Sequence, residues 1–362
     1  MKIIVAVIIA LLVCFPVRAE APESLSARSA VLMDAASGRL LYEKNGFEKL
    51  SMASTTKIMT AILAIENCDM DDVVTVSPAA SGVEGSSLWL EVGEQLTVRQ
   101  LLLGLMLRSG NDAAVALAEQ TAGSVEAFVL MMNSKAKEIG MYNTGFETPN
   151  GLDSDNHYTT AYDMAVLARY AMKNPAFREI VATEKAQIPW AGHDWNRALE
   201  NHNKLLKSYE GCTGIKTGFT KKSGRCLVSS AERGGRELIC VTLNAPDDWN
   251  DHTRLLNHGF EDFETITIAK QGRMLKTVQI DDEQVGLLFA DDFVTSLRLG
   301  EATELRSEIS EMTLPVHKGQ ILGRVYIFSG GEFLGGVDLL ADRDIAPEGF
   351  LDLIFKIAKG MI

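Results

Sequence analysis

The chain has 362 residues, of which 46% are apolar and 23% are charged, a composition that suits a globular protein with room for two domains. Its formal net charge is −13, so it lacks an electrostatic basis for binding nucleic acid, and we expect no nucleic-acid partner. The six histidines are scattered without a His-x-x-x-His pair. We therefore interpret them as structural or surface residues and predict no metal site.

The first 19 residues have the pattern of a secretory signal peptide. Lys2 precedes an uncharged apolar run over 3–15, and Val17-Arg18-Ala19 ends the segment in small-x-small order. We predict cleavage after Ala19 and export, with an uncleaved membrane anchor as the alternative. Cleavage removes two cations, so the mature charge would be 33 minus 48, or −15. The four cysteines that remain are spaced irregularly, which predicts neither a metal pattern nor a disulfide framework.

The first half of the mature chain combines a hairpin with a mostly helical stretch that runs from Ser54 to about Tyr170. Turn residues interrupt the first apolar segments, and cap residues mark the ends of two later ones. The elements predicted here are a hairpin of strands 30–33 and 39–42, a helix over 98–107 capped by Thr97, and a helix over 113–121 ending at Gly123.

The pattern changes to β over 212–243, where we predict three strands at 214–219, 225–231 and 238–243. Strands at both ends of this part of the chain, around a helical middle, suggest a sheet closed by its first and last segments. The predicted fold class is therefore α+β, with an antiparallel sheet and a helical region.

After Phe260 the sequence consists of short β-type segments with little helix between them, which predicts a separate small all-β domain. The segments are 274–280, 285–290, 293–299, 321–328 and 333–340. The predicted division of the chain is a signal peptide over 1–19, a first domain over 20–262, an all-β domain over 263–348 and an amphipathic helix over 349–362.

The first candidate for chemistry is Ser54-x-x-Lys57, at the start of an apolar helical segment. Residues three apart emerge from the same face of a helix, so the hydroxyl and the amine would be neighbours. They could be a nucleophile and its base, because a serine hydroxyl attacks poorly until a base takes its proton. They could also be an N-cap serine and a solvated lysine.

Two triplets favour the catalytic interpretation. Ser109-Gly110-Asn111 lies between the two predicted helices, and Lys216-Thr217-Gly218 lies on the first late strand. Lysine is a base only when neutral, and burial with a second cation nearby lowers its pKa. Lys216 would supply that cation, Ser109 would relay a proton to a leaving amine, and Asn111 would orient Lys57 and the substrate.

Together these motifs resemble those of the penicillin-binding proteins and serine β-lactamases. The wider context is similar to the low-molecular-mass D-alanyl-D-alanine carboxypeptidases. The similar stretches are "ASTTKIMTA", "GSSLWLEVGEQLTVRQLLLGLMLRSGNDAA", "TPNGLD", "YTTAYDMA" and "GIKTGFT". The likeness runs from about Ser29 to Phe263 and more loosely through the predicted β domain.

The resemblance implies an exported serine carboxypeptidase that removes the terminal D-alanine from peptidoglycan stem peptides and is inhibited covalently by β-lactams. It implies no cofactor. Its site residues would be the nucleophile Ser54, the base Lys57, the relay and orienting residues Ser109 and Asn111, and the substrate-binding residues Lys216, Thr217, Gly218 and Phe219. The backbone N–H groups of Ser54 and Phe219 would form the oxyanion hole. A D,D-endopeptidase, a β-lactamase and a catalytically idle wall-binding scaffold are the alternatives.

The chain departs from its relatives in two places. Phe219 stands where some relatives have histidine, so only its backbone role transfers. Some relatives carry an arginine after the last strand that grips the terminal carboxylate, and only Arg254 offers a counterpart here, which leaves that anchor open. We interpret Glu147 as a surface loop residue and Cys226, opposite Gly218 on the neighbouring strand, as a buried inert thiol.

The final segment, 350–362, has one polar stripe on an otherwise apolar helix. Thirteen helical residues reach about 20 Å, too short for a hydrocarbon core of roughly 30 Å. The segment is therefore predicted to lie on the membrane surface, as a similar anchor does in relatives. A terminal helix packed on the β domain is the alternative.

Overall fold

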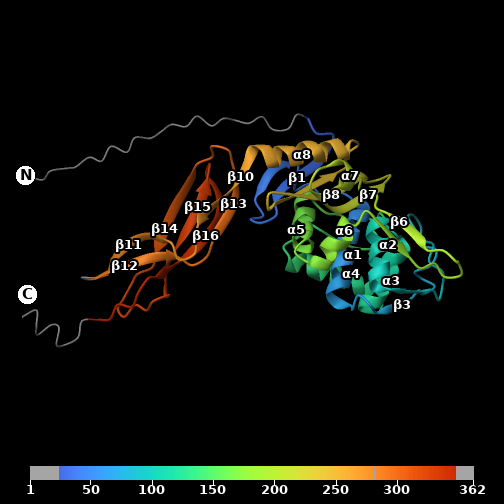
Figure 1. The fold of residues 1–362 in the computed structure, drawn as a ribbon, viewed down its shortest axis with the longest axis horizontal. Helices are drawn as coiled ribbons and strands as arrows, with labels where there is room; N and C mark the ends of the chain where they lie inside the picture. The colour runs from blue at the N-terminus through green and yellow to red at the C-terminus, as the bar shows by residue number, and fades with distance from the viewer. Residues whose placement is uncertain (1–23, 281–282, 348–362) are drawn as a thin grey trace, which may run out of the picture. The chain divides into compact units, whose positions relative to one another are not determined.

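The computed structural model describes residues 24–280 and 283–347, which form two compact units with a boundary between Asp262 and Phe263 (Figure 1). The predicted signal peptide and the predicted terminal helix lie outside the described residues.

The first unit is built on a five-stranded antiparallel sheet in which the N-terminal hairpin joins the late strands. Its spatial order is β2 (Leu40–Lys44), β1 (Ser29–Asp34), β9 (Arg236–Leu243), β8 (Gly224–Arg233) and β7 (Cys212–Thr220). The register places Val31 opposite Val241, which closes the sheet with the first and last strands as predicted. The hairpin and the α+β class are confirmed, and β7 is left at the edge of the sheet.

Helices cover both faces of this sheet, and every residue of β1 is therefore buried. Figure 1 shows α8 along one face and α5 and α6 on the other. The helices are α1 (Lys57–Asn67), α2 (Val98–Leu107), α3 (Asn111–Ala122), α4 (Val125–Glu138), α5 (Ala161–Ala171), α6 (Pro175–Ala182), α7 (Leu205–Ser208) and α8 (Asp248–Asp262). The apolar core lies between the sheet and the helices α1 to α6.

Capping residues that are visible in the sequence fix the ends of α2 and α3, the helices on either side of the Ser109–Asn111 segment. Thr97 accepts a hydrogen bond from the backbone N–H of Gln100, whose side chain accepts one from the backbone N–H of Thr97. This reciprocal capping box starts α2 as predicted. Gly123 ends α3 in a left-handed conformation with φ 81°, which glycine adopts without steric cost.

Two small two-stranded sheets interrupt the helical part of the unit. They are β3 (Val73–Thr75) with β4 (Gln95–Thr97), and β5 (Lys185–Ile188) with β6 (Arg197–Glu200). Neither sheet was predicted from the sequence, and α8 was not predicted either. Strands of three or four residues carry too few alternating positions to stand out from a loop.

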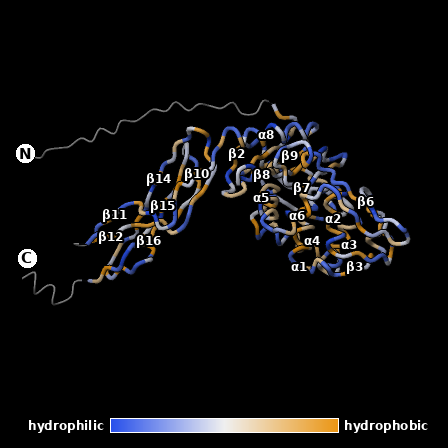
Figure 2. The backbone as a smooth tube through the Cα atoms, in the orientation of Figure 1, coloured by the Kyte–Doolittle hydropathy of each residue, from blue (hydrophilic) through white to orange (hydrophobic). Residues whose placement is uncertain are grey.

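The second unit is entirely β, as predicted. It contains a two-stranded sheet of β10 (Phe263–Ala269) and β13 (Phe293–Arg298), and a five-stranded sheet in the order β11 (Met274–Ile280), β12 (Glu283–Phe289), β16 (Glu332–Ala341), β15 (Ile321–Ser329) and β14 (Thr303–Ile309). Buried and exposed positions mostly alternate along β15, and Figure 2 shows the mixed hydropathy of these strands. Strands β10 and β14 were not predicted, because most residues of β14 are exposed and the buried and exposed positions of β10 do not alternate regularly.

Among the described residues no single helix is long and apolar enough to cross a membrane. Helices α3 and α4 meet the length and composition requirement only as a bent pair, with 83° between them.

Candidate active site

The candidate nucleophile lies in a short 3₁₀ turn, η1, directly before α1. The prediction that the α-helix begins at Ser54 is wrong, because α1 begins three residues later. The hydroxyls of Thr55 and Thr56 donate hydrogen bonds to the carbonyls of Met52 (2.6 Å) and Ala53 (2.8 Å), which competes with the α-helical pattern. Ala53 has φ 47°, a left-handed conformation that is unusual for alanine. The turn thus holds Ser54 in a fixed position at the mouth of the helix.

Lys57, the candidate base, is completely buried and its Nζ has three neighbours. It lies 3.0 Å from Ser54 Oγ, 2.7 Å from Asn111 Oδ1 and 2.5 Å from the carbonyl oxygen of Asn150. A neutral amine has two N–H donors and one lone pair. The two amide oxygens can accept the two N–H groups, which leaves the lone pair directed at the serine hydroxyl.

The electrostatic surroundings favour that neutral form. Burial lowers the pKa of Lys57 well below its ordinary value, and the positive charge of Lys216 lowers it further, against an opposing effect of Asp112. Burial also lowers the pKa of Lys216, to about 7. Two ammonium groups in one low-dielectric site repel each other, so protonation of one amine disfavours protonation of the other.

The joint between α2 and α3 brings a second hydroxyl to the site. Ser109 has φ 62° and is buried, yet its Oγ makes no hydrogen bond within the part of the chain that the structure describes. Asn111 begins α3, and its Nδ2 donates to the carbonyl of Glu84 at 2.5 Å while its Oδ1 accepts from Lys57. Hydrogen bonds thus hold both the nitrogen and the oxygen of the Asn111 side-chain amide, whereas the Ser109 hydroxyl remains available to a ligand.

Edge strand β7 forms the opposite side of the site. Lys216 is buried and donates to the carbonyl of Thr217 at 2.9 Å, while the side chain of Phe219 is 66% exposed. A Cβ on Gly218 would lie 3.1 Å from the backbone nitrogen of Ser54. Glycine at this position therefore lets the strand approach the nucleophile turn closely.

These segments border a cleft of about 840 Å³. Of the eight residues predicted for the site, Ser54, Ser109, Thr217, Gly218 and Phe219 line the cleft directly. The other three, Lys57, Asn111 and Lys216, are buried, and two of them contact each other as described above. The structure therefore brings together residues that are up to 165 positions apart in the sequence.

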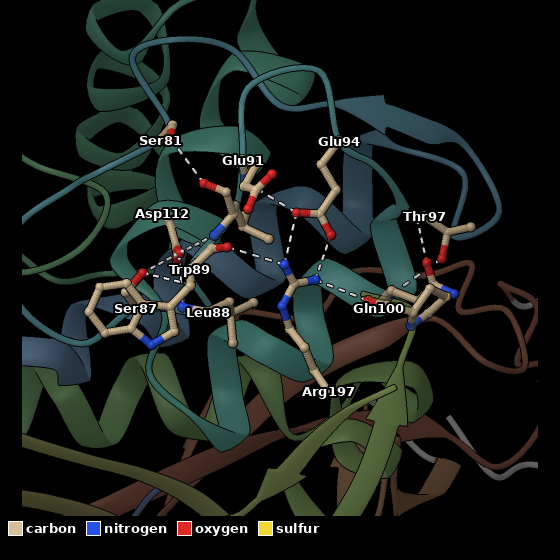
Figure 3. A network of polar contacts seen from close by, with 12 residues as sticks. Ser81, Ser87, Leu88, Trp89, Glu91, Glu94, Thr97, Gln100, Asp112 and Arg197 are labelled. Atoms are coloured by element: carbon tan, nitrogen blue, oxygen red, sulfur yellow. Dashed lines mark hydrogen bonds and ion pairs between the residues drawn. The ribbon is translucent and has the colours of Figure 1, made fainter. Parts of the chain in front are cut away.

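One wall of the cleft depends on a buried ion pair (Figure 3). Arg197 on β6 donates to both carboxylate oxygens of Glu94, and both side chains are at most 5% exposed. Burial works to raise the pKa of Glu94, but the hydrogen bond and the charge of Arg197, together with backbone hydrogen bonds, outweigh it, and the net pKa is lowered. Arg197 also donates to the carbonyl of Trp89 at 3.2 Å. The pair thereby fastens the hairpin β5–β6 to the loop that carries the cleft residue Ser86.

Asp112, next to the candidate site residue Asn111, holds the same loop from inside. Its carboxylate accepts hydrogen bonds from Ser87 Oγ (2.6 Å) and from the backbone N–H groups of Leu88 (2.8 Å) and Leu90 (3.2 Å), as Figure 3 shows. The start of α3 and the cleft wall are therefore one connected unit.

Several cleft residues were missed by the sequence analysis. His202, which we interpreted as structural, lines the cleft, as do Arg225, Asp248 and Trp249. Burial, followed by the charges of Lys216 and Arg108, lowers the pKa of His202. The run "NHN" and the arginine after the turn "KKSG" are polar, but neither indicates a cleft without the fold. Arg254 is exposed and is absent from the cleft lining.

Two other sequence expectations have a clear outcome. Cys226 lies opposite Gly218 in the register and is fully buried, and burial raises the pKa of its thiol to about 11. Glu147 is an exposed loop residue whose carboxylate accepts from Asn156. Within residues 24–280 and 283–347, no group of three or more His, Cys, Asp or Glu side chains is arranged to hold a metal ion.

Comparison with known proteins agrees with this arrangement. The family described as D-alanyl-D-alanine carboxypeptidase matches residues 16–247, and the C-terminal domain of penicillin-binding protein 5 matches residues 263–347. The chain belongs to the D-alanyl-D-alanine carboxypeptidase family. The predicted membership, the serine-type hydrolase class and the two-part fold are thereby confirmed.

Individual relatives cover nearly the whole chain. D-alanyl-D-alanine carboxypeptidase DacF of Bacillus subtilis is 36% identical over 91% of this chain and 88% of its own length. DacC of Escherichia coli is 34% identical over 93% of this chain and 88% of its own length. The crystal structure of penicillin-binding protein 5 from Haemophilus influenzae has 29% identity and a TM-score of 0.78, covering 91% of this chain and 100% of that one.

The contribution of the buried Glu94–Arg197 ion pair in this carboxypeptidase can be tested by measuring protein stability. Replacing Glu94 with Gln leaves Arg197 buried without a counter-charge, so we expect the free energy of unfolding of the first unit to fall by about 3–5 kcal/mol. Denaturant unfolding monitored by tryptophan fluorescence measures this change. The matched control is Glu179→Gln, which removes an exposed ion pair with Arg99 and should cost less than about 1 kcal/mol. Equal effects of the two variants would contradict the role of the buried pair.

Proposed function

We propose that this carboxypeptidase removes the terminal D-alanine from peptidoglycan stem peptides through an acyl-enzyme on Ser54. The observation that carries the proposal is the 3.0 Å contact between the buried amine of Lys57 and Ser54 Oγ. A serine nucleophile requires a base within hydrogen-bonding distance, and a lysine serves as one only where its pKa is lowered.

In the proposed acylation step, Ser54 Oγ attacks the carbonyl carbon between the two terminal D-alanines while Lys57 takes its proton. The negative charge then forms on the former carbonyl oxygen, where the backbone N–H groups of Ser54 and Phe219 would stabilise it. Each such donor contributes about 3–4 kcal/mol in serine hydrolases. The close approach of β7 to the nucleophile turn at Gly218 supports this pairing of donors.

The C–N bond breaks as a proton reaches the leaving amine, and Ser109 is proposed to relay that proton. Its buried hydroxyl, which makes no hydrogen bond within the described residues, supports this role. Lys216 and Thr217 would bind the terminal carboxylate, and Gly218 would allow the substrate backbone to approach. Water then hydrolyses the ester, so the cycle consumes one water and releases D-alanine and the shortened peptide without a cofactor.

The same geometry predicts covalent inhibition by β-lactams. The strained amide of a penicillin is attacked like the peptide bond, and its carboxylate meets the same cations. Intact-mass spectrometry after incubation with benzylpenicillin should show one added penicilloyl group, and Ser54→Ala should show none. An adduct that persists in Ser54→Ala would overturn the assignment of the nucleophile.

The proposed base is tested by replacing Lys57 with Arg. Arginine keeps the positive charge but does not give up its proton in proteins, so we expect loss of acylation with the fold retained. In the unmodified enzyme, kcat/KM for a diacetyl-Lys-D-Ala-D-Ala peptide should fall as pH decreases through the depressed pKa of Lys57, because protonation removes the base. Penicillin acylation of Lys57→Arg at a near-normal rate would move the base role to another group.

We further propose that the protein is exported and that segment 349–362 holds it at the outer face of the cytoplasmic membrane, where it acts beside the cell wall. The apolar N-terminal segment and the polar stripe of the terminal segment support this proposal. Truncation after Pro347 should move the protein from the membrane fraction to the soluble fraction without loss of peptide hydrolysis. If the truncated protein stays with membranes, or fails to fold, the anchoring role is wrong.

A further inference from the structure

A cation that the proposed reaction does not yet use lies in the cleft beside its substrate-binding strand. Arg225, near the start of β8, is the register partner of Phe219 on β7. Side chains of a cross-strand pair lie on the same face of a sheet, and Thr217, two residues before Phe219, shares that face. All three residues line the cleft. The guanidinium and the Thr217 hydroxyl therefore border the same space.

The guanidinium is held by two residues from the start of α8. Its Nε and Nη2 lie 3.0 and 2.8 Å from Asp248 Oδ1, which also accepts the backbone N–H of Trp249 at 3.0 Å. The guanidinium lies over the Trp249 ring, 5.5 Å from its centroid. The Asp248 side chain is 2% exposed and that of Arg225 is 41% exposed. A buried carboxylate and an aromatic ring thus fix a cation whose outer side faces the cleft.

Some N–H donors of the Arg225 guanidinium remain unused in this arrangement. A guanidinium has five N–H donors, and the contacts above engage only Nε and Nη2. Nη1 has no acceptor among the residues that the structure describes. Since a guanidinium binds a carboxylate through two parallel hydrogen bonds, the unused side of Arg225 matches a carboxylate ligand.

A second cation is useful here because Lys216 is buried and its amine already donates to the carbonyl of Thr217 at 2.9 Å. Burial also lowers the pKa of Lys216, to about 7, so the charge of its amine depends on pH around neutrality. Arginine stays protonated at every physiological pH. Of the other cations in the lining, Lys207 forms an exposed ion pair with Glu200. Arg108 and Lys204 are exposed, and neither forms an ion pair with a carboxylate among the residues that the structure describes.

We propose that Arg225 binds the α-carboxylate of the terminal D-alanine together with Thr217, and that Asp248 and Trp249 position its guanidinium for that contact. The inference rests on the proposed carboxypeptidase function and adds the residue that makes the enzyme specific for a free C-terminus. Arg254, the counterpart that the sequence offered for a carboxylate-binding arginine, is exposed and does not line the cleft.

The test compares two substrates that differ only at the C-terminus, diacetyl-Lys-D-Ala-D-Ala and its C-terminal amide. The measured quantity is the ratio of their kcat/KM values, from release of D-alanine or D-alaninamide. We expect the full-length enzyme to prefer the free acid and Arg225→Gln to lower that ratio about 10-fold to 100-fold, the effect of losing a charged hydrogen bond. Arg254→Gln is the matched control and should leave the ratio unchanged.

A purely structural role of Arg225 predicts a different result. If the arginine only tied β8 to α8, Arg225→Gln would slow both substrates equally and the ratio would stay constant, which would overturn the inference. Arg225→Lys guards against misfolding, because it retains the charge and should recover part of the ratio. If the unmodified enzyme releases no D-alanine from the free acid, the proposed function itself fails, independently of Arg225.

The positioning role of Asp248 has its own readout. Asp248→Asn weakens the hold on the guanidinium without removing its charge, so we expect KM for the free acid to rise severalfold while kcat changes little. KM for the amide should stay the same. A matching fall of kcat for both substrates would indicate general disruption of the site and would contradict positioning.

Discussion

The Lys57 amine lies out of contact with water, 3.0 Å from the Ser54 hydroxyl, and the surrounding structure is arranged to satisfy it. An ammonium group buried in this way is costly, so the amine is stable there in its neutral form with its N–H groups paired. The acceptors are the side chain of Asn111 and the carbonyl of Asn150, which come from different segments of the chain. Three separate segments must therefore meet at one nitrogen, and the fold of the first unit is what brings them there.

The connection extends outward from that nitrogen. Asn111 begins α3, Asp112 beside it holds the loop over residues 87–90, and the pair of Glu94 and Arg197 fastens this loop to β6. The wall of the cleft is thus joined to the base by a continuous series of buried polar contacts. Such networks fix geometry strongly when every member is satisfied. The position of the Ser54 hydroxyl relative to the Lys57 amine therefore depends on residues that contact neither group.

The features that could be predicted from the sequence are those encoded locally. Spacing alone places Lys57 one turn after Ser54, Thr97 carries a visible capping signal, and the three late strands alternate clearly. The pairing of Gly218 with Cys226 followed from the position of the turn between their strands. In each case the determining residues lie within about ten positions of each other, where period and turn chemistry suffice.

The contacts that could not be predicted join distant parts of the chain. Glu94 and Arg197 are 103 positions apart, and nothing in either neighbourhood indicates that they are partners. Arg225 and Asp248 come together only because β8 and α8 are adjacent in the fold. The 3₁₀ turn could not be predicted for a related reason: the Thr56 hydroxyl that donates to the carbonyl of Ala53 also contacts His157 Nε2 at 2.8 Å, 101 positions away in the sequence.

The left-handed conformations of Ala53 and Ser109 have a consequence for how this enzyme can evolve. Each non-glycine residue in that region costs on the order of 1 kcal/mol or more, and both sit beside the reacting groups. Ala53 is also enclosed, since a Cβ on Gly151 would come within 2.0 Å of its carbonyl oxygen and one on Gly218 within 3.2 Å of its methyl group. The nucleophile turn is therefore closely packed on both sides. Selection for a more stable protein would act against these two conformations, whereas selection for fast acylation would retain them. Thermal stability and turnover therefore depend on the same few backbone angles.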